Sequence, residues 1–490
     1  MKLSNATLAK LPAAVARPAY DRARLRAGIV HIGCGNFHRA HMAVYLDDLF
    51  VRGEGLDWAI LGAGVRESDA AMRAALEPQD WMTTVIELEP GAHSARVTGS
   101  MAGFVPVRAG NAGLIAAMSD PGIRIVSLTV TEGGYFIDPR TGTFSTDHPD
   151  ILKDAANPGA PDTAFGAIVA ALKARAAAGV RPFTVMCCDN VPHNGRVTRD
   201  AVVGLARLSD PGFAEWIAAN VAFPNSMVDR ITPATGARER AMAAAMGVDD
   251  AWPVTCEPFR QWVIEDNFPA GRPALEKVGV TFTPHVDRFE TMKIRILNGG
   301  HAIIAYPGGL FDIALVHEAM AHPLIRGFLD AVEAREILPV VPPVPGVELD
   351  GYRRLIIDRF ANPDVGDTIR RLCLDGSNRQ PKFILPSIRD NLGRGVVPDG
   401  LILESALWCR YCFGVSESGA EIAPNDPNWD RLTAQARRAK DDPAVWLAMG
   451  EVYGDLGADA RVAARFGDIL RAVWARGAGL AMRDYIDGRL

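Results

Sequence analysis

The chain has 490 residues, which is too long for one ordinary hydrophobic core, so at least two domains are expected. Hydrophobic residues make up 48% of it, yet no segment approaches the roughly 18 consecutive apolar residues of a transmembrane helix, and its start does not read as a signal peptide. A net charge of −6 without a basic run gives no electrostatic basis for binding nucleic acid or an anionic membrane, so we exclude both and expect a cytoplasmic enzyme.

The first buried strand is predicted over 28–33, and it runs into a glycine turn that is followed by a helical pattern. Such a turn directs backbone N–H groups and a helix N-terminus at one point, which suits a pyrophosphate. His38 stands where the dinucleotide motif G-x-G-x-x-G has its third glycine, so the motif alone fits an ordinary turn equally well. The turn residues that we expect to hold a cofactor are Gly33, Gly35, Asn36 and Phe37.

The second apolar run, 58–65, is followed by the charged segment 66–69. An acid at the tip of this strand would bind the ribose hydroxyls and would favour NAD by repelling a 2′-phosphate. Glu67 is the first candidate, and Asp69 replaces it if the turn is longer. Arg66 beside them weakens the preference for NAD, and a solvated loop remains the alternative for these charges.

Two further buried strands are predicted over 123–130 and 182–188, after an antiparallel excursion near 82–88. Polar residues follow each strand: Thr131 and Glu132, expected at the cofactor, and then Asn190. Strands that end in polar turns, with helices between them, predict a Rossmann-like, doubly wound parallel sheet whose ligand crevice lies at the carboxyl ends. A cap or turn role is the alternative for Asn190.

A polar loop over 224–233 and a strand-like run over 252–263 complete the first part of the chain. From about residue 286 onward the apolar spacing is helical almost throughout. We therefore predict an α/β protein with two domains: a dinucleotide-binding domain with inserted strands over 1–285, and a mostly α-helical substrate-binding and catalytic domain over 286–490.

The segment 290–304 is predicted to be a buried helix that carries a lysine, an amide and an imidazole. On a helix Asn298 and His301 share a face, and Lys293 lies about 100° away on a neighbouring line. Gly299 and Gly300 each cost about 1 kcal/mol against alanine in a helix, so they indicate a close approach by another group. A core helix with a satisfied histidine is the alternative to a site.

A second polar segment, 367–383, is rich in cations and contains Arg371 and Arg379. It fits either a solvated basic face or a binding loop. The seven cysteines form no disulfide framework in a chain of this size, so reduced thiols are expected. Cys409 and Cys412 have the spacing of half a zinc site, but no second pair of ligands accompanies them, so no metal site is predicted.

Taken together, several blocks resemble the polyol-specific long-chain dehydrogenases, the mannitol 2-dehydrogenase family. They keep the same order and cover most of the chain from residue 28 to about 390. The blocks are the glycine turn 33–41, the segments 131–135, 188–195 and 226–233, and Lys293 with Asn298 and His301.

The resemblance implies metal-independent hydride transfer between NAD and a secondary alcohol. In that family the lysine matching Lys293 is the general base, the asparagines matching Asn190 and Asn298 hold the reacting oxygen, and His301 matches a residue that orients the substrate. A lysine can serve as the base if its pKa falls from about 10.4 toward 7–8. By position, the further substrate-side residues are Asp229, Arg371 and Arg379.

The expected reaction is the reversible oxidation of a sugar alcohol to a ketose, of the D-mannitol to D-fructose type, which belongs to carbohydrate metabolism. The resemblance also implies a monomer. A hexuronate reductase of the fructuronate to mannonate type is the alternative enzyme, since a cation such as Arg371 could hold a carboxylate. A catalytically idle nicotinamide-binding sugar sensor is the alternative of another class. Glu290 either passes the proton from Lys293 to water or is a simple surface carboxylate.

Overall fold

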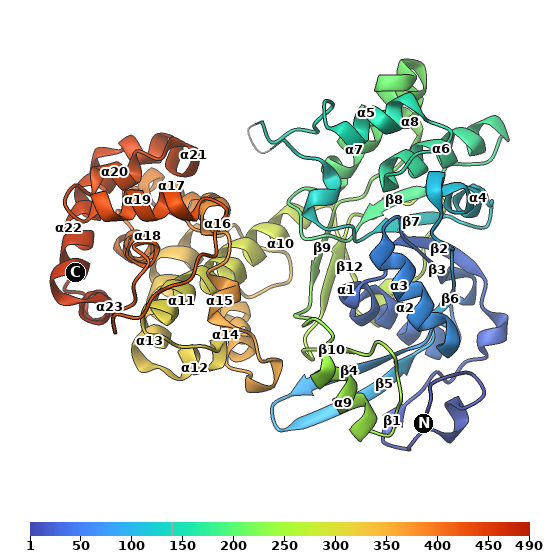
Figure 1. The fold of residues 1–490 in the computed structure, drawn as a ribbon, viewed down its shortest axis with the longest axis horizontal. Coiled ribbons are helices and arrows are strands. Elements are labelled where there is room, and N and C mark those ends of the chain that lie inside the picture. The colour runs from blue at the N-terminus through green and yellow to red at the C-terminus, as the bar shows by residue number, and fades with distance from the viewer. Residues whose placement is uncertain (139–140) are drawn as a thin grey trace. The chain divides into compact units, whose positions relative to one another are not determined.

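The computed structural model describes residues 1–138 and 141–490, which divide into two compact units, Met1–Val286 and Asp287–Leu490 (Figure 1). The first unit is built on a parallel sheet of the Rossmann type, and the second is helical. This confirms the predicted fold class.

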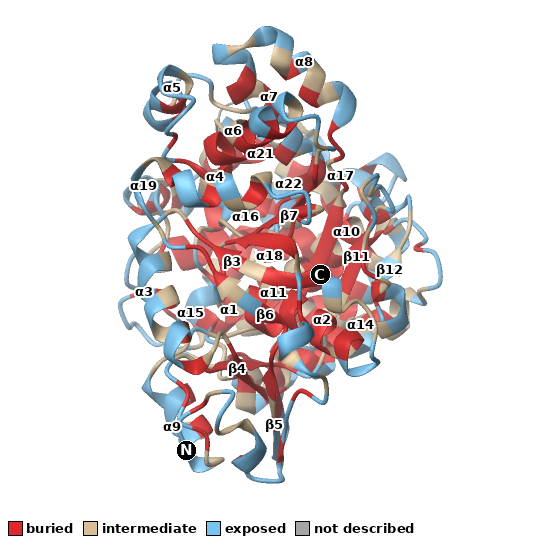
Figure 2. Ribbon diagram, turned by 90° about the vertical axis from the view of Figure 1, so that its right-hand side faces the viewer, coloured by how far each residue is buried: buried red, intermediate tan, exposed pale blue. Residues whose placement is uncertain are grey.

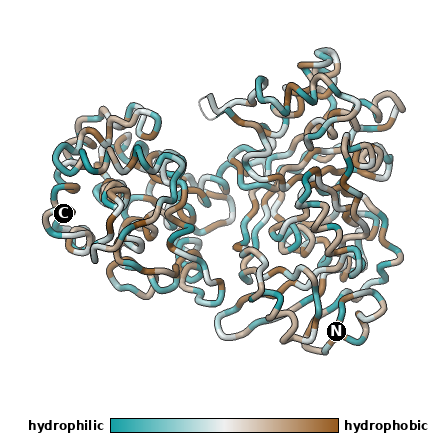
Figure 3. The backbone as a smooth tube through the Cα atoms, viewed as in Figure 1, coloured by the Kyte–Doolittle hydropathy of each residue, from teal (hydrophilic) through white to brown (hydrophobic). Residues whose placement is uncertain are grey.

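The central sheet of the first unit has the strand order β6-β3-β2-β7-β8, and all its pairs are parallel. Its inner strands are near-continuous apolar runs because both faces are covered; β7 appears as a buried ribbon in Figure 2, and Figure 3 shows brown, hydrophobic stretches inside this unit. The strands are β2 (Ala27–Ile32), β3 (Ala59–Ala63), β6 (Met101–Phe104), β7 (Ile125–Leu128) and β8 (Thr184–Cys187).

Alternate residues of the sheet face two different helical layers. Val30 and Ile32 join the core formed with α4, α6 and α7, whereas Ile29 joins the core formed with α2 and α3. The helices of the first unit are α1 (Asn36–Ala40), α2 (Met42–Val51), α3 (Glu67–Leu76), α4 (Ala112–Ser119), α5 (Pro149–Ala156), α6 (Ala164–Ala177), α7 (Asn194–Ser209), α8 (Pro211–Asn220) and α9 (Ala237–Ala245).

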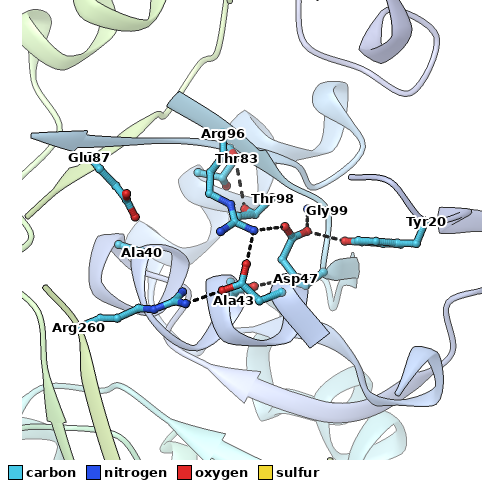
Figure 4. Close-up of polar contacts among 12 residues, drawn as sticks. Tyr20, Ala40, Ala43, Asp47, Thr83, Glu87, Arg96, Thr98, Gly99 and Arg260 are labelled. Carbon is cyan, nitrogen blue, oxygen red and sulfur yellow. Dashed lines mark hydrogen bonds and ion pairs between the residues drawn. The ribbon is translucent and has the colours of Figure 1, made fainter. Parts of the chain in front are cut away.

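The predicted antiparallel excursion is a hairpin of β4 (Thr83–Glu89) and β5 (Ala92–Thr98), extended by β10 (Val254–Cys256) and β1 (Val15–Ala16). An ionic network ties the hairpin to α2 (Figure 4). Arg96 on β5 donates to Asp47 on α2 at 2.7 Å, and Asp47 also accepts from the Tyr20 hydroxyl at 2.6 Å. The excursion is therefore fixed to the helix that follows the glycine turn.

The prediction of a polar loop over 224–233 is wrong for the middle of this segment. The residues there form strand β9 (Ser226–Asp229), which pairs antiparallel with β11 (Gln261–Ile264). A third, short strand, β12 (Thr281–Phe282), completes this sheet. All four residues of β9 are buried. These residues form a strand because they pair with β11. Four residues with polar ends are too few to show the apolar–polar alternation from which a strand is predicted.

The second unit is a helical assembly around α18, in which every residue from Gly400 to Cys412 is buried. Helices α11 and α22 pack directly on α18. No helix among the described residues combines the length and the apolar composition needed to cross a membrane. The helices are α10 (Val286–Met292), α11 (Gly299–Leu310), α12 (Val316–Ala321), α13 (Pro323–Val332), α14 (Leu349–Phe360), α15 (Ile369–Leu372), α16 (Gly376–Phe383), α17 (Leu385–Gly393), α18 (Asp399–Cys412), α19 (Trp429–Ala439), α20 (Ala444–Leu447), α21 (Gly450–Tyr453), α22 (Ala460–Arg476) and α23 (Ala478–Ile486).

Candidate active site

In the first unit a cavity of about 520 Å³ opens at the carboxyl ends of β2, β3 and β7. This is the edge of a doubly wound sheet at which ligands bind. Four of the residues that the sequence assigns to a cofactor line it: Gly33, Gly35, Asp69 and Thr131.

Gly33 is required by the backbone of the turn. Its φ is +97°, and a Cβ added there would lie 2.1 Å from the carbonyl oxygen of Thr129. Gly35 has an ordinary φ of −66°, and a Cβ added there would meet no atom within 4 Å. The first glycine therefore serves the fold of the turn, and the second leaves open space above the N-terminus of α1.

These two glycines give a paired prediction. Gly33→Ala should destabilise the free protein by about 1–3 kcal/mol, because the strained φ and the backbone clash both oppose a side chain there. Gly35→Ala should leave the melting temperature of the free protein unchanged but weaken dinucleotide binding, since its methyl group would occupy the open space. Thermal melting and calorimetric titration of both variants check this; a Gly35→Ala protein with wild-type dinucleotide affinity would contradict the placement.

Asn36 and Phe37 anchor the turn and do not line the cavity. The Asn36 side-chain amide donates to the Pro233 carbonyl and to the Thr235 hydroxyl, each at 2.9 Å, and the Phe37 ring stacks on His41. Their predicted contribution to cofactor binding would be indirect.

The missing third glycine is explained by a pair of histidines. The His38 ring stacks on His31 of β2 with 3.5 Å between centroids, and His31 is hydrogen-bonded to Ser127 and Thr129 at 2.8 Å each. An imidazole layer thus fills the helix–strand contact that glycine keeps close in other dinucleotide-binding turns.

The two acids proposed for the ribose differ in their surroundings. Asp69 accepts from the backbone N–H groups of Val65 and Arg66 at 3.0 and 2.9 Å, so its carboxylate holds the turn after β3. Glu67 is exposed at the first position of α3 and does not line the cavity, whereas Arg66 and Ser68 do.

The segment after β7 is held by a carboxylate that sequence reasoning passed over. Asp189, two residues after the end of β8, accepts from the N–H groups of Val130 and Thr131 and from the Tyr135 hydroxyl, at 2.8, 3.1 and 2.7 Å. Thr131 has a φ of +67°, a conformation that non-glycine residues rarely adopt and that concentrates at functional sites. Glu132 lines a neighbouring cavity. The sequence signal that could have identified Asp189 was an acidic residue next to a predicted buried strand.

The remaining predicted residues of this unit, Asn190 and Asp229, stand at strand ends. Asn190 is exposed and follows the segment that ends β8, and Asp229 is buried as the last residue of β9. Asn190 lies beyond the carboxyl end of a strand of the parallel sheet, the edge at which ligands bind, whereas Asp229 ends a strand of the separate sheet of β9, β11 and β12; neither residue lines the cavity.

In the second unit the predicted helix over 290–304 is present without a break, but its hydrogen-bonding pattern changes along its length. Between α10 and α11, Lys293–Asn298 form a π-helical turn. The i→i+5 hydrogen bonds of such a turn place residues five apart more nearly on the same face of the helix than an α-helix does. The side chains of Lys293 and Asn298 are therefore separated by a smaller angle around the helix axis than predicted. Single π-turns within helices occur often at functional sites. Lys293 is only 7% exposed.

The predicted close approach is confirmed at Gly300. A Cβ there would lie 2.8 Å from Glu333 Oε1 and 3.2 Å from the Phe360 ring, whereas a Cβ on Gly299 would meet its nearest atom at an ordinary 3.4 Å. Gly300 therefore lets α11 pack closely against neighbouring segments of the same unit.

His301 follows directly and is held flat against Phe360, with 4.2 Å between ring centroids. Its Nε2 is buried without a hydrogen-bond partner among the residues that the structure describes. Burial, and then the positive charge of Arg371, lower the pKa of His301 to about 3. The imidazole is therefore neutral at physiological pH and can act only as a hydrogen-bonding group.

The cation-rich segment is two short helices, α15 and α16, joined at Asp375, which has a φ of +61°. Helix α15 packs on α11, and α16 packs on the π-turn. Arg371 Nε donates to Asp367 Oδ1 at 2.6 Å, and its Nη2 donates to Asp367 Oδ2. Arg379 Nη1 donates to the carbonyls of Arg371 and Leu372 at 3.2 and 3.1 Å. The second unit thus carries five predicted site residues on four packed elements, the π-turn, α11, α15 and α16, and Asp367 is an addition.

The cysteines of the chain are all free and buried, and Cys409 and Cys412 lie inside α18. Over residues 1–138 and 141–490, no group of three or more His, Cys, Asp or Glu side chains is placed to hold a metal ion.

Comparison with known families matches both units. The model described as the mannitol dehydrogenase Rossmann domain matches residues 27–277, and the mannitol dehydrogenase C-terminal domain matches residues 285–474. The mannitol 2-dehydrogenase of Cereibacter sphaeroides is 67% identical over 472 residues, which cover 96% of this chain and 99% of the relative. That of Aspergillus fumigatus is 43% identical, covering 93% of each chain.

Two solved structures are similar over nearly the whole chain. The ternary complex of Pseudomonas fluorescens mannitol 2-dehydrogenase with NAD and D-mannitol has a TM-score of 0.87 and 41% identity, covering 99% of this chain and 100% of that one. A substrate-free D-sorbitol dehydrogenase has a TM-score of 0.91 and 34% identity, covering 98% of this chain and 100% of that one.

Proposed function

The chain belongs to the mannitol dehydrogenase family, and from that premise we propose that it is a polyol dehydrogenase that oxidises a secondary alcohol of a sugar alcohol to a ketose, reversibly and with NAD. The observation that carries the proposal is the buried π-turn with Lys293 at one end and Asn298 at the other, three residues before His301. A D-mannitol to D-fructose reaction is the form that we favour, because the mannitol 2-dehydrogenases among the relatives are 67%, 43% and 41% identical to this chain, against 34% for the D-sorbitol dehydrogenase.

NAD is the proposed cofactor, and the first unit offers it a suitable cradle. The open space at Gly35, the N-terminus of α1 and the cavity at the carboxyl ends of the strands fit a pyrophosphate and its flanking groups. The similar Pseudomonas fluorescens structure contains NAD. When bound, the nicotinamide supplies the hydride acceptor, which an amino-acid side chain cannot provide.

Lys293 is proposed as the general base that removes the hydroxyl proton as hydride leaves the carbon. It must be neutral to do so, and burial is the effect that lowers the pKa of a lysine toward neutrality. Glu290, three residues earlier on α10, is 7% exposed, so it is not the simple surface carboxylate of the alternative interpretation. We assign it the role of passing the proton from Lys293 toward water.

Asn190 and Asn298 are proposed to donate their amide N–H groups to the oxygen that becomes negative during oxidation. Each well-aimed donor of this kind contributes about 2.7–4 kcal/mol to stabilisation of the transition state. His301, neutral and fixed against Phe360, and Arg371 would orient the remaining hydroxyls, with Asp229 and Arg379 as further substrate-side residues. In this arrangement, the lysine and the two amides do the work that a metal ion does in other alcohol dehydrogenases.

The experiment that tests the proposal is a substrate panel of mannitol, sorbitol, arabinitol and mannonate, assayed with NAD and with NADP. We expect NADH formation with a polyol, slow reaction with mannonate, and lower kcat/KM with NADP. If mannonate is the best substrate, the protein is the alternative hexuronate reductase. If no member of the panel reacts although NAD binds, the protein is a sensor. Equal efficiency with both cofactors would overturn the proposed NAD preference.

A further inference from the structure

Arg371, one of the cations that we propose on the substrate side, is already paired within its own unit. Its Nε and Nη2 groups both donate to the carboxylate of Asp367, with 2.6 Å between Nε and Oδ1. These two groups form the edge of a guanidinium that clasps a carboxylate with two parallel hydrogen bonds. A carboxylate on a substrate would find this edge occupied.

The Asp367 carboxylate is fixed from several sides. Its Oδ1 also accepts from the backbone N–H of Thr368 at 2.8 Å. Burial alone would raise the pKa of this carboxyl, but the contact with Arg371 holds it below its ordinary value. Asp367 is therefore ionised at neutral pH, and the pair carries no net charge.

The pair is oriented with its cation outward. The Arg371 side chain is 51% exposed, whereas that of Asp367 is 11% exposed. This leaves Nη1 of Arg371 directed away from the carboxylate, where it can donate to the hydroxyl oxygens of a sugar alcohol. A hydroxyl oxygen needs a hydrogen-bond donor but no net positive charge, so the pairing of Arg371 with Asp367 does not weaken the binding of a polyol.

The neighbouring positive groups of this segment are also tied to the protein. Arg379 donates to the carbonyls at the end of α15, and Arg370 donates to the carbonyls of Ala423 and Pro424 at 3.1 and 2.8 Å. His301, which lies close to Arg371, is neutral. Hydrogen bonds to neutral carbonyls fix the direction of the Arg370 and Arg379 guanidinium groups without cancelling their charge, whereas the charge of Arg371 is balanced by the carboxylate of Asp367.

We propose that Asp367 sets the specificity of this site, selecting neutral polyols over sugar acids by occupying the Nε/Nη2 edge of Arg371 and cancelling its charge. The proposal rests on the proposed polyol dehydrogenase function and adds to it the residue that separates sugar alcohols from aldonates. Asp367 acts through Arg371, so it is a positioning residue.

The test is Asp367→Asn, compared with the wild type on mannitol and on mannonate. The variant frees the charge of Arg371, so the kcat/KM ratio of mannonate to mannitol should rise by about tenfold or more, through a lower KM for mannonate. Asp367→Glu keeps the negative charge and should keep the wild-type ratio. Asp468→Asn removes the carboxylate of an exposed ion pair on α22 and is the matched control, for which no change is expected.

An unchanged ratio in a folded Asp367→Asn protein, or an equal loss with both substrates, would overturn the proposal and leave Asp367 a purely structural residue. If this variant does not fold, the test is made on the wild-type enzyme instead. Inhibition of the wild type by mannonate should be nearly independent of salt concentration between about 0.05 and about 0.5 M. Inhibition that weakens markedly as salt is added would contradict a neutral Asp367–Arg371 pair. A wild type that oxidises no polyol would refute the proposed function itself, which is a different result.

Discussion

Lys293→Ala should remove nearly all turnover while leaving NAD binding intact. Without the amine no positioned group takes the hydroxyl proton, and general-base catalysis by a side chain contributes about 10²–10⁴-fold to rate. Lys293 does not line the cavity that we assign to NAD, so dinucleotide affinity should change little. Steady-state rates near neutral pH and calorimetric titration with NAD measure the two effects separately.

Two controls separate lost chemistry from lost structure in this experiment. Lys440→Ala removes an exposed lysine of the same unit and should keep wild-type activity. Small primary amines added to the Lys293→Ala protein should restore part of the rate, which they could not do if the lysine only supported the fold. A variant that retains more than about a tenth of the wild-type rate would remove Lys293 as the base.

Asn298→Ala and Asn190→Ala should each lower kcat by about 100- to 1,000-fold with little change in KM, because an amide donor aimed at a developing alkoxide stabilises the transition state much more than the alcohol. Asn298 lies at the end of the π-turn, and Asn190 follows β8. Initial-rate measurements over a range of polyol concentrations give kcat and KM for each variant.

Asn220→Ala, at the end of the surface helix α8, is the control for loss of an amide and should be indistinguishable from the wild type. If both site variants changed only KM, the asparagines would be binding residues without a role at the reacting oxygen.

The parallel sheet could be predicted from the sequence because its strands are buried on both faces. Runs such as 28–33 and 123–130 are mostly apolar, and the glycine or polar residues after them mark the carboxyl edge where the cavity lies. The strand β9 could not be predicted, since four residues with a serine and an aspartate at its ends become a strand only by pairing with β11.

The geometry around the candidate site was harder to predict from the sequence, for two physical reasons. A π-turn and an α-turn need the same apolar residues, so the change of hydrogen bonding at Lys293–Asn298 leaves no trace in the residue pattern. The role of a carboxylate depends on its partners. Asp69 holds a backbone turn, although the sequence suggested a ribose ligand or a solvated charge, and Asp367, which the sequence analysis did not single out, pairs with Arg371. The four-residue spacing of Asp367 and Arg371 was the one available hint.

The most direct test of the account is NADH formation from mannitol by enzyme that has been exhaustively treated with a metal chelator. With a lysine as the base and two amides at the reacting oxygen, no Lewis acid is required, so we predict an unchanged initial rate with NAD. Loss of activity on chelation that is restored by added zinc would contradict the metal-independent mechanism.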